Sequence, residues 1–277
     1  MTPPTILVPL DGTAEAAVAL PVARTLGEVY GATLQIVHIG STTLTPSALA
    51  EKLGLTPEEL RGVVIDQVAG RPATRIVQLA NERGSRFIVL CTQAIADRPS
   101  GALGHVAQEV ICETSSPVVL VPPERGMAPW RLREVLMPHD GTPATAVALA
   151  PAAQLAAHAQ ARLIVLHVAA PGTAPPAEPG TMGAPRYVDQ PQHEWSTWAD
   201  EFLERLVALC GCTPAVTPQV VLCTGDPGAE VVRVARERGS DLIVLAWRGH
   251  PEEGRGETVK TVVRGAPCPV CVVRVEP

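Results

Sequence analysis

The feature that most constrains the fold is a long internal repeat, in which each copy begins with an apolar run that ends in Asp-Gly-Thr. The first run reads TILVPLDGT and the second EVLMPHDGT, so that Asp11 and Asp140 hold equivalent positions 129 residues apart. Solenoid repeats span only about 20–50 residues, whereas each copy here is long enough to form a core of its own. A chain of 277 residues with this repeat is expected to fold as two related domains.

The spacing between equivalent residues locates the domain boundaries and an insertion. We expect domains over residues 1–124 and 131–277, joined by a Pro-containing linker over 125–130. The offset between the copies rises from 129 near their beginnings to 155 at Gly70 and Gly225, so the second copy gains 26 residues between these points. Most of them fall in residues 171–191, which are rich in Pro, Gly and Ala and are predicted to form an inserted loop.

Within each copy, short apolar runs alternate with longer amphipathic stretches. The expected strands are 5–10, 33–39, 63–68, 87–91 and 117–121 in the first copy, and 133–138, 162–168, 219–223, 241–246 and 269–274 in the second. The expected helices are 14–29, 46–53, 57–62, 72–83, 104–113, 144–158, 195–209, 227–238 and 256–264. Strands that are almost continuously apolar and alternate with helices indicate an α/β fold, with a parallel sheet covered on both faces. Right-handed crossovers favour a doubly wound topology.

Composition and charge exclude several classes of function. The net charge is −6 and the isoelectric point is near 5.7, so no electrostatic footprint for nucleic acid is present. Aromatic residues make up 3% of the chain, which leaves little for stacking on bases. No apolar run approaches the roughly 20 residues of a membrane span, and the N-terminus lacks a signal-peptide pattern. We expect a soluble cytoplasmic protein with no membrane partner.

The seven cysteines lie mostly in or beside apolar runs. They are Cys91, Cys112, Cys210, Cys212, Cys223, Cys268 and Cys271. This pattern favours buried thiols in a reducing compartment over a disulfide framework. Cys268 and Cys271 have the spacing of a metal or redox pair, but a single pair within a strand, with no second pair of ligands, is weak evidence for either.

Taken in order, the motifs resemble those of the universal stress protein family. Besides the Asp-Gly-Thr strand end, they include a histidine in the second strand (His38 and His167), a Gly-x-Pro helix opening, and APCPVCVV at 266–273. Each motif is weak alone, but their order recurs twice and covers most of the chain. The resemblance implies two Rossmann-like domains of the adenine nucleotide alpha hydrolase type, each with a five-stranded sheet of order 3-2-1-4-5. It also implies an intrachain pseudo-dimer, paired through the last strands.

The resemblance further implies that ATP is the ligand, with Mg²⁺ only as its companion. The nucleotide would lie where the strand order reverses, between strands one and four. In the family, the aspartate at the end of strand one contacts adenosine. A Gly-x2-Gly-x9-Gly-Ser/Thr motif holds phosphate, because glycines let backbone N–H groups approach and the last one opens a helix.

Both copies depart from this phosphate motif. The first copy places it at Cys91, Ala94, Gly104 and His105, with intact spacing but two glycines replaced. The second copy places it at Ala246, Gly249, Gly256 and Glu257, with three residues missing and a carboxylate where phosphate would lie. The candidate nucleotide-binding residues are Asp11, Gly12, Ile39, Cys91, Ala94, Gly104, His105, Asp140, Gly249 and Gly256.

Structural interpretations stand beside the functional ones. Asp11 and Asp140 also suit turns that cap the next helix, and His38 and His167 suit strand-end histidines held by hydrogen bonds. His139 beside Asp140 suggests a catalytic dyad, but neighbouring strand residues point to opposite faces of a sheet.

Two functions of different classes stay open. The first is a stress-linked regulator that binds ATP in the first domain, with the second site further decayed or suited to a smaller nucleotide. The second is an interaction scaffold for an unknown protein partner, in which both pockets have lost their ligand. No nucleophile–base pair, Walker motif or metal cluster is evident, so we expect no dedicated enzymatic reaction. Slow ATP hydrolysis and the association of two chains stay open.

Overall fold

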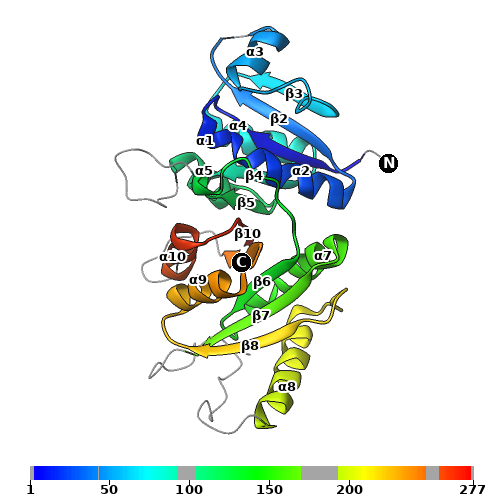
Figure 1. The fold of residues 1–277 in the computed structure, drawn as a ribbon, viewed down its shortest axis with the longest axis vertical. Helices are drawn as coiled ribbons and strands as arrows, with labels where there is room; N and C mark the ends of the chain where they lie inside the picture. The colour runs from blue at the N-terminus through cyan, green and yellow to red at the C-terminus, as the bar shows by residue number, and fades with distance from the viewer. Residues whose placement is uncertain (1–2, 43, 93–103, 170–192, 248–255, 276–277) are drawn as a thin grey trace.

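The computed structural model describes residues 3–42, 44–92, 104–169, 193–247 and 256–275 (Figure 1). Its centre is one ten-stranded sheet in the order β3-β2-β1-β4-β5-β10-β9-β6-β7-β8. Each half therefore has the order 3-2-1-4-5, as expected, and all pairs within a half are parallel. The predicted fold class is confirmed.

The elements follow the alternation seen in the sequence. Those of the first half are β1 (Thr5–Pro9), α1 (Ala14–Ala17), α2 (Ala19–Tyr30), β2 (Thr33–Ile39), α3 (Pro46–Lys52), β3 (Val63–Val68), α4 (Pro72–Glu82), β4 (Ser85–Cys91), α5 (His105–Glu113) and β5 (Val118–Val121). A short 3-10 helix, η1 (Pro123–Arg125), follows. Those of the second half are β6 (Glu134–His139), α6 (Pro143–Ala146), α7 (Leu149–Ala159), β7 (Arg162–Ala169), α8 (His193–Cys210), β8 (Gln219–Thr224), α9 (Pro227–Arg238), β9 (Leu242–Trp247), α10 (Glu257–Gly265) and β10 (Val270–Arg274).

Three helix predictions were wrong in detail. The helix expected over 14–29 breaks at Val18, whose N–H bonds back to Glu15 and Ala16 and so closes a tight turn. The same break recurs between α6 and α7, where the helix had been expected to run unbroken over 144–158. The helix expected over 57–62 is a run of turns. It begins with a capping box, but Gly62 adopts φ +69° before a second turn can form.

Two groups of helices cover opposite faces of the sheet. One face packs against α1, α2, α3, α6, α7 and α8, with aliphatic side chains such as Leu26 and Leu155 fully buried. The other packs against α4, α5, α9 and α10, with side chains such as Ile76 and Val262 buried. Because both faces are buried, the central strands are apolar along their whole length.

The halves meet through antiparallel pairing of β5 with β10, in which Val119 lies opposite Cys271. This confirms the expected intrachain pseudo-dimer, joined through its last strands. Side chains reinforce the junction: the Tyr30 ring of α2 stacks on the His158 ring of α7 at 4.5 Å. The Trp130 indole donates to the carbonyl of Asp241, and its own carbonyl accepts from Thr25. The ten strands therefore form one continuous unit.

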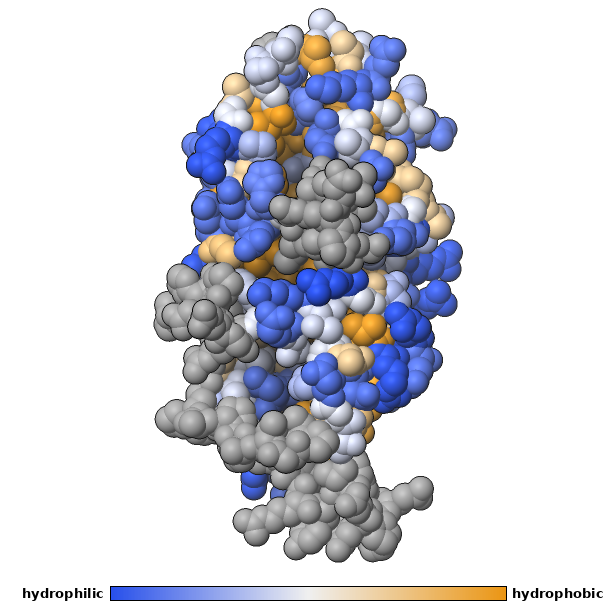
Figure 2. Space-filling view, turned by 90° about the vertical axis from the view of Figure 1, so that its left-hand side faces the viewer, coloured by the Kyte–Doolittle hydropathy of each residue, from blue (hydrophilic) through white to orange (hydrophobic). Residues whose placement is uncertain are grey.

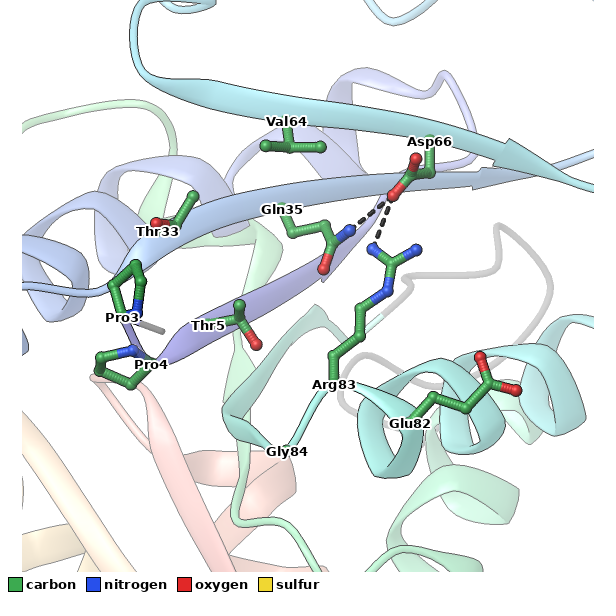
Figure 3. Close-up of a pocket in the computed structure, with 10 residues that line it drawn as sticks. All are labelled: Pro3, Pro4, Thr5, Thr33, Gln35, Val64, Asp66, Glu82, Arg83 and Gly84. Atoms are coloured by element: carbon green, nitrogen blue, oxygen red, sulfur yellow. Dashed lines mark hydrogen bonds and ion pairs between the residues drawn. The ribbon is translucent and has the colours of Figure 1, made fainter. Parts of the chain in front are cut away.

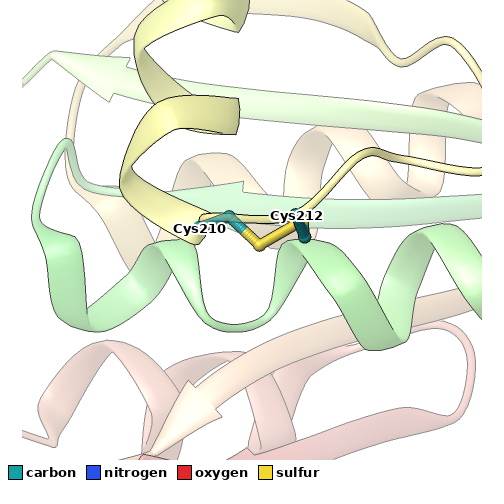
Figure 4. Close-up of a disulfide and its surroundings, with 2 residues drawn as sticks. All are labelled: Cys210 and Cys212. Carbon is teal, nitrogen blue, oxygen red and sulfur yellow. A yellow bond between two sulfur atoms is a disulfide. The ribbon is translucent and has the colours of Figure 1, made fainter.

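One expectation about the cysteines is corrected. Cys210, the last residue of α8, forms a disulfide with Cys212 (Figure 4). The two residues are separated only by Gly211, which adopts φ +61° and turns the chain so that the sulfurs can meet. The other five cysteines are free thiols, as expected. None of the helices within the described ranges is long and apolar enough to cross a membrane.

Candidate functional site

The sequence-predicted residues of the first domain gather at the carboxyl ends of its strands. Asp11 and Gly12 follow β1, Ile39 ends β2 and Cys91 ends β4. Gly104 lies immediately before α5, the helix that leads from this edge to β5. Figure 2 views this edge of the molecule, where hydrophilic side chains predominate among the described residues. Ala94 and Gly249 lie outside the described residues.

Asp11 organises the turn between β1 and α1. Its Oδ1 accepts hydrogen bonds from the backbone N–H of Thr13 at 2.9 Å and from the Thr13 hydroxyl at 2.7 Å. The Thr13 hydroxyl oxygen in turn accepts from the N–H of Ala16 and caps α1. The capping role that the sequence offered as the structural interpretation of Asp11 is therefore present, and it holds the carboxylate at the edge of the sheet.

A lysine that the sequence did not single out lies beside this turn. Nζ of Lys52 is 3.1 Å from Nε2 of His38, and Nδ1 of His38 is 2.8 Å from the carbonyl of Leu10. The carbonyl can only accept, so Nδ1 donates to it and the neutral ring offers its Nε2 lone pair to the ammonium group. His38 is thus the hydrogen-bonded strand-end histidine that the sequence suggested. A Cβ on Gly12 would lie 3.2 Å from the carbonyl oxygen of Lys52, so the end of α3 crosses directly over Gly12.

Cys91 is a protonated thiol within this edge. Burial, followed by the nearby carboxylates of Asp11, Glu124 and Glu15, raises its pKa to about 12. It is therefore no nucleophile at neutral pH. The same carboxylates make this part of the sheet edge acidic, so an anionic group would be expected nearer to α5.

The N-terminus of α5 is suited to an anion. Gly104 is buried at the N-cap position and makes no side-chain cap, and the first turn contains no acidic residue. The first N–H groups of a helix have no partner within the helix and carry its positive dipole end. His105 is exposed at the first helical position, so no carboxylate stands there to compete with a bound anion.

The aspartate of the second domain accepts a hydrogen bond from a threonine whose counterpart in the first domain is an alanine. Oδ1 of Asp140 accepts from the N–H and hydroxyl of Thr142, and also from the hydroxyl of Thr145 at 2.6 Å. Thr145 stands where the first domain has Ala16. Burial acts to raise the pKa of Asp140, but the donors of Thr142 and Thr145, together with His139, hold that pKa below its ordinary value.

His139 replaces Leu10 of the first domain and is a buried neutral ring. Its Nδ1 accepts from the N–H of Gly141 at 2.8 Å, so the proton of the neutral ring is on Nε2. Nε2 has no hydrogen-bond partner among the described residues, and the ring packs edge-on against Phe202. Burial lowers the pKa of His139 to about 4, with Asp140 opposing the shift and His167 adding to it. Within the described part of the chain, no hydrogen bond joins the His139 ring to the carboxylate of Asp140, which gives no support to a dyad.

The helix terminus of the second domain differs from that of the first. A Cβ on Gly256 would lie 3.1 Å from Cζ3 of Trp247, so the indole ring covers this glycine. Glu257 occupies the first position of α10 and pairs with Lys260 at 2.8 Å. Its carboxylate therefore already provides the negative charge that this end of the helix favours.

Sequence reasoning missed Lys52, Thr145 and Trp247, because only the tertiary fold brings them to the two edges. Thr145 alone could have been found by aligning the copies, which sets it against Ala16. The described residues contain no group of three or more His, Cys, Asp or Glu side chains that could hold a metal ion.

Comparison with known proteins agrees with the repeat. The profile of the universal stress protein family matches residues 4–122 and 131–274. A universal stress protein from Thermus aquaticus, described by its position in the QAH/OAS sulfhydrylase 3′ region, is 31% identical over 133 residues; the alignment covers 42% of this chain and 97% of that protein.

Solved structures show the same fold over the full chain. A universal stress protein from Archaeoglobus fulgidus DSM 4304 superposes with a TM-score of 0.67 at 18% identity, covering 98% of each chain. A functionally unknown protein from Pseudomonas aeruginosa PAO1 gives 0.65 at 17% identity, covering 98% of this chain and 92% of that one. With the family profile matched in both halves, the chain belongs to the universal stress protein family as a tandem member with two such domains.

Proposed function

We propose that this tandem universal stress protein is a nucleotide-responsive regulator that binds one adenine nucleotide, ATP, in its first domain. The observation that carries the proposal is the difference between the two helix termini. In α5 the buried Gly104 leaves the helix end without an acidic group, whereas α10 already has Glu257. A phosphate at the α5 terminus would accept from N–H groups and lie at the positive end of the helix.

The rest of the first site fits a nucleoside. The Asp11 carboxylate is held at the edge of β1 by the Thr13 turn, and Ile39 offers an apolar contact at the end of β2. The ammonium group of Lys52 lies near the same edge, beside His38, and supplies a positive charge that the sequence motif lacks. A bound nucleotide would bring its own Mg²⁺, since the described residues include no metal cluster.

In the second domain, Glu257 would repel a phosphate, and the Trp247 ring lies against the glycine of the helix terminus. These two residues favour a second function for this half, that of an interaction surface for a protein partner that needs no nucleotide. The two functions are compatible within one chain, because the continuous sheet would join the half that binds a nucleotide to the half that binds a protein partner.

The proposal is tested by titrating purified protein with ATP in a calorimeter, alongside Asp11→Ala and the matched variant Asp140→Ala. The proposal predicts saturable binding by the wild type, binding that is about tenfold weaker in Asp11→Ala, and unchanged binding in Asp140→Ala. If the wild type shows neither heat of binding nor a shift in melting temperature at millimolar ATP, the nucleotide proposal is wrong. The interaction scaffold is then the remaining hypothesis.

A further inference from the structure

A groove of about 640 Å³ lies at the opposite edge of the first domain, where its strands begin (Figure 3). Thr5, Thr33 and Val64, near the amino ends of β1, β2 and β3, line it together with Pro3 and Pro4. The C-terminal end of α4 and the following Arg83 form the opposite wall. This edge is remote from the crevice proposed for ATP, which lies at the carboxyl ends of the same strands.

The groove contains a buried acceptor whose orientation is set by its neighbour. Gln35 is only 6% exposed, and its Nε2 donates to Oδ2 of Asp66 at 2.5 Å. A carboxylate accepts hydrogen bonds and does not donate them, so the amide cannot be turned over. Oε1 of Gln35 therefore faces away from Asp66, and it has no hydrogen-bond partner among the described residues. Figure 3 shows this oxygen turned toward the space between Thr5 and Arg83.

The charged groups of the groove form a partly exposed pair. Nη1 of Arg83 lies 2.6 Å from Oδ2 of Asp66, and the two side chains are 29% and 31% exposed. The guanidinium group has five N–H donors, and its recorded contact with Asp66 uses Nη1 alone. The residues that line the groove thus include a buried carbonyl oxygen without a hydrogen-bond partner among the described residues, next to a partly exposed guanidinium group.

The second domain has different side chains at the positions equivalent to those that line this groove. There, the residue equivalent to Thr5 is Glu134, which is 2% exposed. Its carboxylate accepts hydrogen bonds from Arg238 and Ser240 at 3.0 Å each and forms an ion pair with Arg162 at 3.0 Å. Arg238 is equivalent to Arg83. Arg238 pairs with the buried Glu134 in the second domain, whereas Arg83 pairs with Asp66 of β3 in the first.

The strand register shows a second difference between the two copies. Gln35 and Asp66 of the first domain correspond to Ile164 and Val221 of the second, as the equivalent strand pairs show. The first domain therefore has polar groups at two positions where its twin is aliphatic. It also has the short side chain of Thr5 where the second domain has the longer side chain of Glu134.

We propose that this groove is a second binding site, independent of the nucleotide, for a small zwitterionic α-amino acid. The ligand's ammonium group would donate to Oε1 of Gln35, and its carboxylate would accept from Arg83. An ammonium ion alone would be repelled by Arg83 and a carboxylate alone by Asp66, whereas a zwitterion complements both. The Pro3, Pro4 and Val64 side chains would pack against the aliphatic part of the ligand; Val64 is 47% exposed and so is accessible for this contact.

The test is calorimetric titration of the full chain with each standard L-amino acid in turn. Methylammonium and acetate, which each carry one of the two charges, serve as separate probes. The first variant, Gln35→Ile, installs the aliphatic residue found at this register in the second domain. The second, Thr5→Glu with Thr33→Arg, installs the residues that the second domain has at these positions, Glu134 and Arg162. Circular dichroism and ATP titration of each variant report that the fold and the remote edge are intact.

The proposal expects at least one amino acid to bind saturably to the wild type. It expects binding about tenfold weaker or more in Gln35→Ile, because the ammonium group loses its acceptor, and none in the double variant. The proposal is overturned if no amino acid binds, which would leave water as the partner of Gln35, or if methylammonium or acetate binds as well as the amino acid. It is also overturned if both folded variants bind like the wild type, since the ligand would then lie elsewhere. None of these outcomes bears on ATP, which is measured separately in the same samples.

Discussion

Nζ of Lys52 lies 3.1 Å from Nε2 of His38, so the last residue of α3 is tied to the second strand across the edge where the first strand ends. The carbonyl of Lys52 crosses over Gly12, within 3.2 Å of where a Cβ would stand. The Asp-Gly-Thr turn thus packs against α3. Glycine is favoured at its centre both because the backbone has positive φ and because a side chain would meet the Lys52 carbonyl.

Substituting Gly12 tests this close approach. Gly12 has φ +97°, and Gly12→Ala would both strain the backbone and push against Lys52. We expect a loss of about 2 kcal/mol in the free energy of unfolding, measured by urea denaturation. The matched control is Gly31→Ala, with φ +58° and no atom within 4 Å of the new Cβ, for which we expect about 1 kcal/mol. Equal losses at the two sites would show that contact with α3 contributes nothing.

The buried carboxylate of Glu134 should contribute more to stability than the exposed pair of the first domain. Glu134→Gln keeps the shape of the side chain but removes the charge that Arg238 and Arg162 contact. Since both arginines reach solvent, we expect a loss of about 2–4 kcal/mol in the free energy of unfolding. Asp66→Asn breaks the partly exposed pair with Arg83 and should cost about 1 kcal/mol or less. A larger loss at Asp66 than at Glu134 would contradict this ranking.

His139 should make the protein less stable in mild acid. Burial lowers the pKa of His139 from 6.5 to about 4 in the folded chain. As the pH falls below about 6.5, the unfolded chain takes up a proton that the folded chain does not, so the free energy of unfolding decreases until about pH 4. The decrease attributable to this group is up to about 3 kcal/mol.

This dependence can be isolated with His139→Leu, which installs the residue of the first domain at the equivalent position. Urea unfolding at about pH 7 and about pH 4.5 should show a smaller difference between the two pH values in the variant than in the wild type. An unchanged difference would mean that other groups, such as His167, carry the whole effect. The pKa of His167 is lowered by burial as well, so part of the dependence should persist in the variant.

The Cys210–Cys212 disulfide is checked by counting thiols. Protein unfolded in denaturant without reductant should give five reactive thiols per chain, and seven after reduction. Seven thiols before reduction would show that the bridge does not form. Because it closes a very short loop, its reduction is expected to change the melting temperature little.

Much of the fold could be predicted, because strands buried on both faces are continuous apolar runs that stand out in the sequence. The strand over 33–39 was predicted to the residue. The break at Val18 was missed because the prediction of one helix over 14–29 did not take account of Pro21, the third residue of α2. A proline has no N–H for the carbonyl four residues back and clashes with it, so an unbroken helix is disfavoured. Pro151 is likewise the third residue of α7, where the same break recurs.

The candidate sites were only partly predictable. The repeat located both aspartates, and aligning the copies revealed Glu257 as a charge at the second helix terminus. Lys52 and Trp247 reach their positions through the packing of α3 and α10, which no local pattern encodes. The groove at Gln35 was likewise invisible in the sequence, since its polar residues are brought together from four separate segments.

The number of ATP molecules bound per chain tests the central claim most directly. Calorimetric titration of the wild type should give one, because the α5 terminus is open to phosphate and the α10 terminus is occupied by Glu257. His105→Glu, which gives α5 the residue that begins α10, should abolish that binding while leaving the fold intact. Two molecules per chain, or binding by His105→Glu equal to that of the wild type, would contradict the account.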